Sequence, residues 1–309
     1  MKKGFFTLLA TALIAVLPLS ARNVSESAPA PKQETKEYRL NGFTGLNVSW
    51  VYQVELTQSL RYSVRVEAPD DLMPYLEVEV RGENLILGVD DSVPRDIRRR
   101  IENPGRNTIR AYVSMPDLYE LKMSGASRLQ AQGEFASRKP FELSLSGAVN
   151  VSNLSVRAAS ADIVASGAAK LYLTGKYDKM SARLSGSVNA TLDVDAKTVD
   201  IQSSGAANLA LNGKYNELSL RGSGAANTDL DGSVDTLEAT GSGAAVLDAR
   251  QTPIRRARIS FSGAANATIS VQDELSVTLS GASKLKYHPG PHLHITDQSV
   301  SRASTLSSF

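Results

Sequence analysis

The sequence predicts an all-β protein, a parallel β-solenoid with coils of about 19 residues. The first observation is a Ser-Gly-Ala triplet, or a near copy, that recurs nine times. The second is that the apolar residues of each copy alternate with a period of two, as in strands. The glycines are Gly125, Gly147, Gly167, Gly186, Gly205, Gly224, Gly243, Gly263 and Gly281, at spacings of 22, 20, 19, 19, 19, 19, 20 and 18 residues.

Each repeat is too short to bury its own apolar face. The residues four and six positions before each glycine are apolar in every copy, as with Ile201 and Val199 before Gly205. No copy places apolar residues at the three- and four-residue spacing of a helix. Stacking the copies in parallel would bury these residues in one continuous core.

The repeated glycine predicts a corner of the coil. A corner requires torsion angles or a close backbone approach that a side chain would prevent. Asparagine follows three residues later in five copies, where stacked amides can form a hydrogen-bonded ladder. These residues are Asn150, Asn189, Asn208, Asn227 and Asn266.

Four segments are expected along the chain. Residues 1–21 have the two lysines and the apolar stretch of a secretory signal peptide, and residues 22–37 are polar and proline-bearing, as in a flexible linker. Residues 38–118 are expected to form a less regular, capping part of the solenoid, and residues 119–309 the repeats with a C-terminal cap. The protein is therefore expected to be exported to the periplasm, the cell surface or the extracellular space, with no transmembrane span after signal cleavage.

The amino-acid composition excludes several kinds of functional site. The absence of cysteine excludes disulfides, thiolate zinc sites and a cysteine nucleophile. Without the two leader lysines, basic and acidic residues are equal in number, so no overall charge favours nucleic acid as a partner. The three histidines lie within residues 288–294 with no evident third ligand, so neither a metal site nor a cofactor is expected.

Two sets of residues are candidates for ligand binding. Ser204 and Ser223 precede corner glycines, and the alternation places them on an outer strip of small residues that could dock an extended glycan or another protein. Asp229 and Asp248 occupy the same position in adjacent coils, about 5 Å apart by the coil rise. Such a pair could bind calcium or act as acid and base, although solvated surface carboxylates are the simpler interpretation.

The region before the repeats resembles a known family. It contains Gly-Leu-Asn-Val at 45–48, Val-Glu-Leu-Thr-Gln at 54–58 and Val-Ser-Met-Pro-Asp-Leu at 113–118, followed by the first Ser-Gly-Ala-Ser at 124–127. This order resembles the head GIN domain family, described as putative autotransporter adhesins, over roughly residues 40–306. The resemblance implies a right-handed parallel β-helix, a place in the bacterial envelope, and an adhesion role without catalytic residues.

The sequence therefore predicts a secreted or envelope-associated, non-enzymatic protein that adheres or binds a surface ligand such as a glycan. Another envelope protein is an alternative partner. Two other functions remain open at this point: a polysaccharide-active enzyme on the same scaffold, and a purely structural envelope spacer.

Overall fold

The structure is a computed structural model that describes residues 32–101 and 108–309. The predicted signal peptide and residues 22–31 of the predicted linker lie outside the described residues. The first elements are β1 (Gln33–Tyr38), β2 (Gly45–Val48), β3 (Tyr52–Gln58), β4 (Ser63–Pro69), a 3-10 turn (Met73–Tyr75), β5 (Leu76–Arg81), β6 (Asn84–Val89), α1 (Arg95–Ile101) and β7 (Ile109–Met115).

Strands make up nearly all of the remaining chain. They are β8 (Glu120–Met123), β9 (Arg128–Gln132), β10 (Glu134–Ala136), β11 (Phe141–Leu145), β12 (Asn150–Arg157), β13 (Ser160–Ala165), β14 (Lys170–Leu184), β15 (Asn189–Ser203), β16 (Asn208–Gly222), β17 (Asn227–Gly241), β18 (Val246–Phe261), β19 (Asn266–Leu279), β20 (Lys284–Pro289), β21 (His294–Val300) and β22 (Thr305–Ser308).

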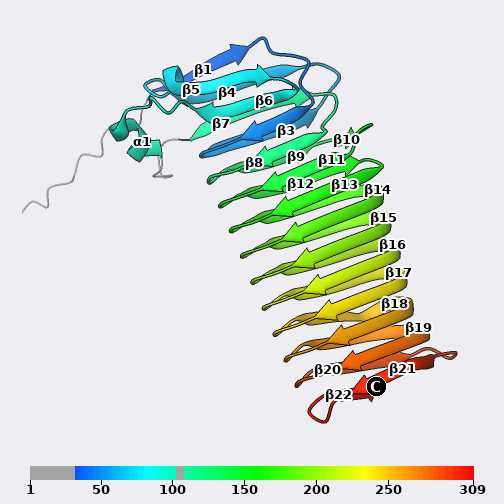
Figure 1. The fold of residues 1–309 in the computed structure, drawn as a ribbon. Helices are drawn as coiled ribbons and strands as arrows, with labels where there is room; N and C mark the ends of the chain where they lie inside the picture. Colours follow the sequence, from blue (N-terminus) through cyan, green and yellow to red (C-terminus); the bar gives the residue numbers. More distant parts are fainter. Residues whose placement is uncertain (1–31, 102–107) are drawn as a thin grey trace, which may run out of the picture. The chain divides into compact units, whose positions relative to one another are not determined.

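The repeats stack as the predicted β-solenoid. Strands β14 to β19 lie side by side, each paired in parallel with the next (Figure 1). Leu192 of β15 lies beside Leu173 of β14 and Leu211 of β16, so equivalent residues form a column. The parallel β-solenoid and its coils of about 19 residues are thereby confirmed.

Each long strand supplies two opposed faces of the solenoid. In β15 the buried residues alternate from Ala190 to Ala196 and then from Val199 to Ser203. Lys197 and Thr198 between them both point outward, so the chain bends there and the alternation shifts by one. We call the half of the coil after each corner the first face and the other half the second face.

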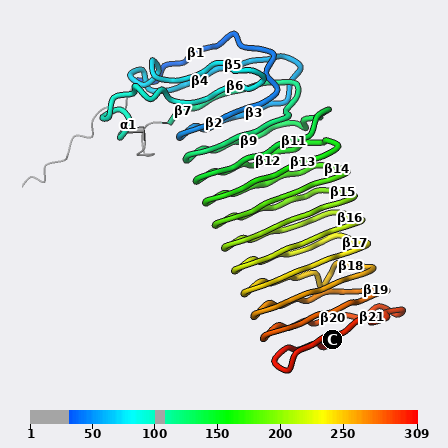
Figure 2. The backbone as a smooth tube through the Cα atoms, in the orientation of Figure 1, coloured from blue at the N-terminus to red at the C-terminus, as the bar shows by residue number. Residues whose placement is uncertain are grey.

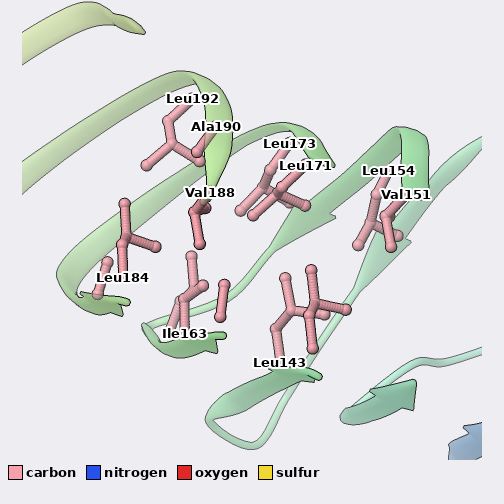
Figure 3. Packing of buried hydrophobic residues seen from close by; sticks show 14 of the residues in the cluster. Leu143, Val151, Leu154, Ile163, Leu171, Leu173, Leu184, Val188, Ala190 and Leu192 are labelled. Atoms are coloured by element: carbon pink, nitrogen blue, oxygen red, sulfur yellow. The ribbon is translucent and has the colours of Figure 1, made fainter. Parts of the chain in front are cut away.

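Side chains from the two faces meet in one core. Figure 3 shows side chains of the second face, such as Ile163 and Leu184, pointing toward side chains of the first face, such as Leu173 and Leu192. All four are at most 3% exposed. Burying a leucine or isoleucine side chain in this way contributes about 1.5–3 kcal/mol, so the stacked columns are the main source of stability.

Large and small residues alternate where the two faces join. Tyr177 and Tyr215 are buried there, and the equivalent residue in the coil between them is Ala196. Two residues before each tyrosine stands a glycine. A Cβ on Gly175 would lie 2.7 Å from the hydroxyl of Tyr177, so the glycine provides the space for the ring.

The corner glycines are required by both conformation and space. Gly205 has φ +79°, and a Cβ there would lie 2.8 Å from the carbonyl oxygen of Gly186 in the preceding coil. The chain approaches this closely because the N–H of Ala206 donates to the same oxygen at 2.9 Å. The corner predicted from the repeat is therefore observed.

The N-terminal part stacks in a different order from the sequence. The coil made by β2 and β3 lies between the coil of β8 and β9 and the coil of β6 and β7, and all three are parallel. Strands β4 and β5 then pair antiparallel with β7 and β6. These reversed strands end the parallel stack.

Part of the predicted linker is a strand. Residues 33–37, placed in the flexible linker by composition, belong to β1, which pairs antiparallel with β4. Their side chains are exposed. The polar composition therefore reflects an edge strand whose side chains face water, and the linker prediction is wrong for these five residues.

The last coil lacks the glycine corner. Arg302 stands where the repeat would place glycine, and it does not adopt the positive φ of the nine glycines. Backbone hydrogen bonds from Ser301 and Thr305 still reach the preceding coil, and the Ser304 hydroxyl donates to the Gly281 carbonyl oxygen at 3.2 Å.

Two glycine-to-alanine substitutions should separate the corner requirement from a general effect of glycine. Gly205→Ala should lower the free energy of unfolding by about 2 kcal/mol or more, because the new Cβ meets backbone at a positive φ. Gly222→Ala should raise it by about 0.5–1 kcal/mol. A Cβ at Gly222 would be in ordinary contact, 3.5 Å from Ala245 Cβ. Urea unfolding monitored by circular dichroism measures both; equal shifts would contradict the corner assignment.

Candidate functional site

The predicted binding serines lie on an exposed strip at the corners. Ser204, Ser223 and the alanines two positions after them are exposed, while the next residue, such as Ala207, is buried. The backbone is fixed beneath them, since the Ser204 N–H donates to the Leu184 carbonyl at 2.9 Å and the Ser223 N–H to the Ser203 carbonyl at 3.0 Å. We call this column of exposed Ser-Gly-Ala residues the corner strip.

The predicted asparagine ladder forms beside the corner strip. The Asn208 Nδ2 donates to Asn189 Oδ1 at 3.0 Å, and the Asn227 Nδ2 donates to Asn208 Oδ1 at 3.0 Å. Asn150 and Asn266 do not extend it, because Lys170 and Val246 occupy the intervening coils. Asn266 instead donates to the Ala264 carbonyl.

A groove runs along the ladder on the first face. We call it the polar groove; its volume is about 390 Å³. The groove continues from one coil to the next, because the outward residues two positions after the asparagines are small and leave space above the strands. It is lined by Asn150, Val151, Ser152, Lys170, Leu171, Tyr172, Asn189, Ala190, Thr191, Asn208, Leu209, Ala210, Asn227 and Asp229.

One lining residue is an exposed aromatic. Tyr172 has 37% of its surface exposed, and its hydroxyl donates to Asp193 Oδ2 at 2.6 Å. This hydrogen bond to a carboxylate is the main reason that the pKa of Tyr172 is raised. Asn212 in the next coil donates to the other oxygen of Asp193, so the ring is held in place beside the groove. The repeat pattern gives no signal for Tyr172, because aromatic residues do not recur at that position.

The two predicted aspartates are neighbours at one end of the groove. Asp229 lines the groove, and Asp248 is its partner in the next coil. They border a second hollow with Asp231 and Arg250. This hollow is lined partly by residues of β18, where the register shifts between Ala249 and Pro253 and the backbone leaves the line of its neighbours (Figure 2).

Asp248 is paired with arginine rather than with its neighbouring aspartate. The Arg250 Nε and Nη2 lie 2.9 and 2.7 Å from its two carboxylate oxygens. The hydrogen bonds from Arg250 lower the pKa of Asp248, so its carboxyl is ionised near neutral pH. It cannot then donate a proton as the general acid of a glycosidase-like pair.

The described residues contain no cluster of three or more histidine, cysteine, aspartate or glutamate side chains placed to hold a metal ion. The calcium interpretation of Asp229 and Asp248 therefore receives no support from additional carboxylates. Within residues 32–101 and 108–309 there is also no helix with the length and apolarity to cross a membrane.

Removing the arginine should change the titration of Asp248. In Arg250→Gln the pKa of the Asp248 carboxyl should rise toward the ordinary value for aspartate. Because the folded-state pKa is lowered, the pair contributes stability above the unfolded-state pKa and loses it as the pH falls through the folded-state pKa. The contribution is small, because the pair is exposed to solvent. Carboxyl-detected NMR titration measures the shift. Arg255→Gln, which breaks the pair with Asp273 instead, should leave Asp248 unchanged.

Solved structures similar to this chain include three from the genus Parabacteroides. A "putative adhesin" from Parabacteroides distasonis is 14% identical, with 90% of this chain and 97% of that chain covered and a TM-score of 0.50. A "putative adhesin" from Parabacteroides merdae is 14% identical, with 90% and 96% covered and a TM-score of 0.48. A "putative lipid binding protein" from P. distasonis is 16% identical, with 90% and 96% covered and a TM-score of 0.41.

No curated protein matches this chain. The family model described as "Putative auto-transporter adhesin, head GIN domain" matches residues 42–212 and 183–291, which together span most of the sequence. The resemblance noted from the motifs at 45–48 and 113–118 is thereby confirmed. This chain belongs to the head GIN domain family.

Proposed function

We propose that this protein is an exported, non-enzymatic adhesin of the cell envelope that binds an extended glycan along its polar groove. The observation that carries the proposal is the groove itself, which presents the same polar groups in successive coils. A polymer with repeating units can meet such a surface several times at once, so individually weak contacts add along its length. The family description as an adhesin supports this proposal.

The asparagine ladder retains hydrogen-bonding capacity for a ligand. A side-chain amide has two N–H donors and two acceptor sites on its oxygen. The ladder uses one donor and one acceptor site of Asn208, so one of each remains. A sugar hydroxyl both donates and accepts, and therefore matches this pair. Because the ladder already orders the side chains, binding costs little further conformational entropy.

The charge of the groove favours a ligand of low net charge. Lys170 lies among its lining residues toward the N-terminal coils, and Asp229 toward the C-terminal coils. Opposite charges at the two ends give no uniform field for a polyanion. The exposed face of Tyr172 adds an apolar surface against which the C–H face of a sugar ring can pack.

The corner strip extends the proposed contact. Ser204 and Ser223 each lie four positions before a groove residue, Asn208 and Asn227 respectively, and their side chains are too small to block a ligand that spreads over the corner. Asp229 and Asp248 then provide acceptor oxygens at the C-terminal end of the groove. The same surface would serve a second envelope protein if the ligand were an extended peptide segment.

Blocking the groove should remove glycan binding without unfolding the protein. We expect Ala210→Lys to abolish binding on a glycan array, because Ala210 lies outward in the groove and a lysine fills it. The double substitution Ser204→Lys and Ser223→Lys should weaken binding if the ligand also covers the corner strip. Gln202→Lys, on the exposed second face, is the matched control. Full binding by Ala210→Lys would contradict the site. No glycan ligand for the unaltered protein would contradict adhesion by glycan and favour the spacer.

An adhesin must face the outside of the cell. Protease added to intact cells should therefore digest the protein, and a periplasmic marker should survive as the control. Complete protection of both proteins would contradict surface exposure and place the binding function in the periplasm.

A further inference from the structure

A third hollow lies near the N-terminal end of the described chain, between the connections that follow β1 and β3. Its volume is about 810 Å³, larger than that of the groove. The connection after β1 and the connection before β4 meet here because β1 pairs antiparallel with β4 up to Tyr38 and Val64. It is lined by Glu37, Tyr38, Arg39, Leu40, Asn41, Leu60, Arg61, Tyr62, Ser63 and Val64.

The two sides of this hollow carry the same three residue types in mirrored order. One side reads Tyr-Arg-Leu at 38–40, and the other reads Leu-Arg-Tyr at 60–62. The two segments adjoin an antiparallel strand pair and therefore run in opposite directions. Each side of the hollow has one aromatic, one cationic and one apolar side chain. We call these six residues the terminal cluster.

Leu60 is presented to solvent, whereas Tyr38, Leu40 and Tyr62 are partly buried against the core. Leu60 is 89% exposed, the most exposed large apolar residue in the described part of the chain. Tyr62 packs against the fully buried Phe43, with 4.8 Å between the ring centroids. Leu60 therefore projects beside Tyr62, which is anchored in the core. A ligand that covers Leu60 would bury apolar surface with little loss of conformational entropy in the protein.

The cationic members have no carboxylate partner. Arg39 and Arg61 are exposed, and neither forms an ion pair with any residue in the described ranges. Glu37 also lines the hollow, and Lys36 lies 5.0 Å from the Tyr38 ring. The cations thus outnumber the single lining carboxylate, and two planar guanidinium groups are free to bind phosphate.

We infer that the terminal cluster docks onto the surface of an anionic lipid bilayer. Arginine side chains bind lipid phosphates, tyrosine rings favour the headgroup level, and an exposed leucine enters the acyl boundary. An acidic glycan would satisfy Arg39 and Arg61 but would leave Leu60 in water. With two arginines and one projecting leucine, the attachment is weak, reversible and sensitive to salt.

Sedimentation with lipid vesicles tests this inference on the exported protein, from which the predicted signal peptide has been removed. The probes are vesicles of phosphatidylglycerol and phosphatidylcholine in equal parts, and vesicles of phosphatidylcholine alone. The variants are Leu60→Ser and the double variant Arg39→Ser with Arg61→Ser. Arg138→Ser is the matched control, because Arg138 is another exposed arginine without an ion pair to a described residue.

The unaltered protein should bind the anionic vesicles and not the neutral ones. Each arginine should contribute about fivefold in partitioning, so the double variant should lose about 25-fold. Leu60→Ser should lose about tenfold, and Arg138→Ser should bind as the unaltered protein does.

Three outcomes would overturn the inference. One is no binding to anionic vesicles, and another is equal binding by all the variants. The third is binding to a soluble sulfated oligosaccharide, weakened by the arginine substitutions and unaffected by Leu60→Ser, without vesicle binding. That last result would assign the cluster to an acidic glycan.

Discussion

Each Ser-Gly-Ala corner rests directly on the corner of the coil before it, and this contact sets the geometry of the whole stack. The Ala206 N–H reaches the Gly186 carbonyl at 2.9 Å, and the Ala225 N–H reaches the Gly205 carbonyl at 2.9 Å. At that separation a Cβ at the corner would collide with backbone, so glycine recurs at the same position. The corner also aligns the coils in register, because a shift of one residue would place a side chain where only glycine fits. The leucine columns of the core follow from this register.

The same register determines the outer surface. Residues that share a position in the repeat become neighbours about 4.8 Å apart, whatever their separation in the chain. Asparagines three positions after the glycine therefore form a ladder, and small residues two positions further leave a groove beside it. Function in such a fold depends on which outward positions the repeat leaves free to vary. Single departures, such as Tyr172 and the bulge after Ala249, give individual coils their own chemistry.

The N-terminal end of the solenoid terminates the parallel stack. Antiparallel β4 and β5 end it, and β1 follows with exposed charged side chains that disfavour further pairing. Trp50 takes the corner position in the β2–β3 coil, with φ +67°, and the Arg98 guanidinium lies 5.1 Å from its ring. A tryptophan at this corner extends beyond the line of the glycines and is covered by α1. The turns that reverse the chain also create the hollow of the terminal cluster.

The sequence by itself determined the solenoid, its coil length, the glycine corners and the inward columns, because each depends on a pattern repeated at nearly constant spacing. The family resemblance came from separate motifs at 45–48, 54–58 and 113–118, followed by the first repeat. The sequence also indicated that Ser204 and Ser223 face outward and that Asp229 adjoins Asp248. Only the tertiary structure decided the pairing of Asp248 with Arg250, the groove beside the ladder and the strand at residues 33–37. It also decided the coil order at the N-terminal end, where β6 and β7 lie outside β2 and β3 although they follow them in the chain. These features arise from contacts that occur once, between residues far apart in sequence, so no repeated pattern in the sequence predicts them.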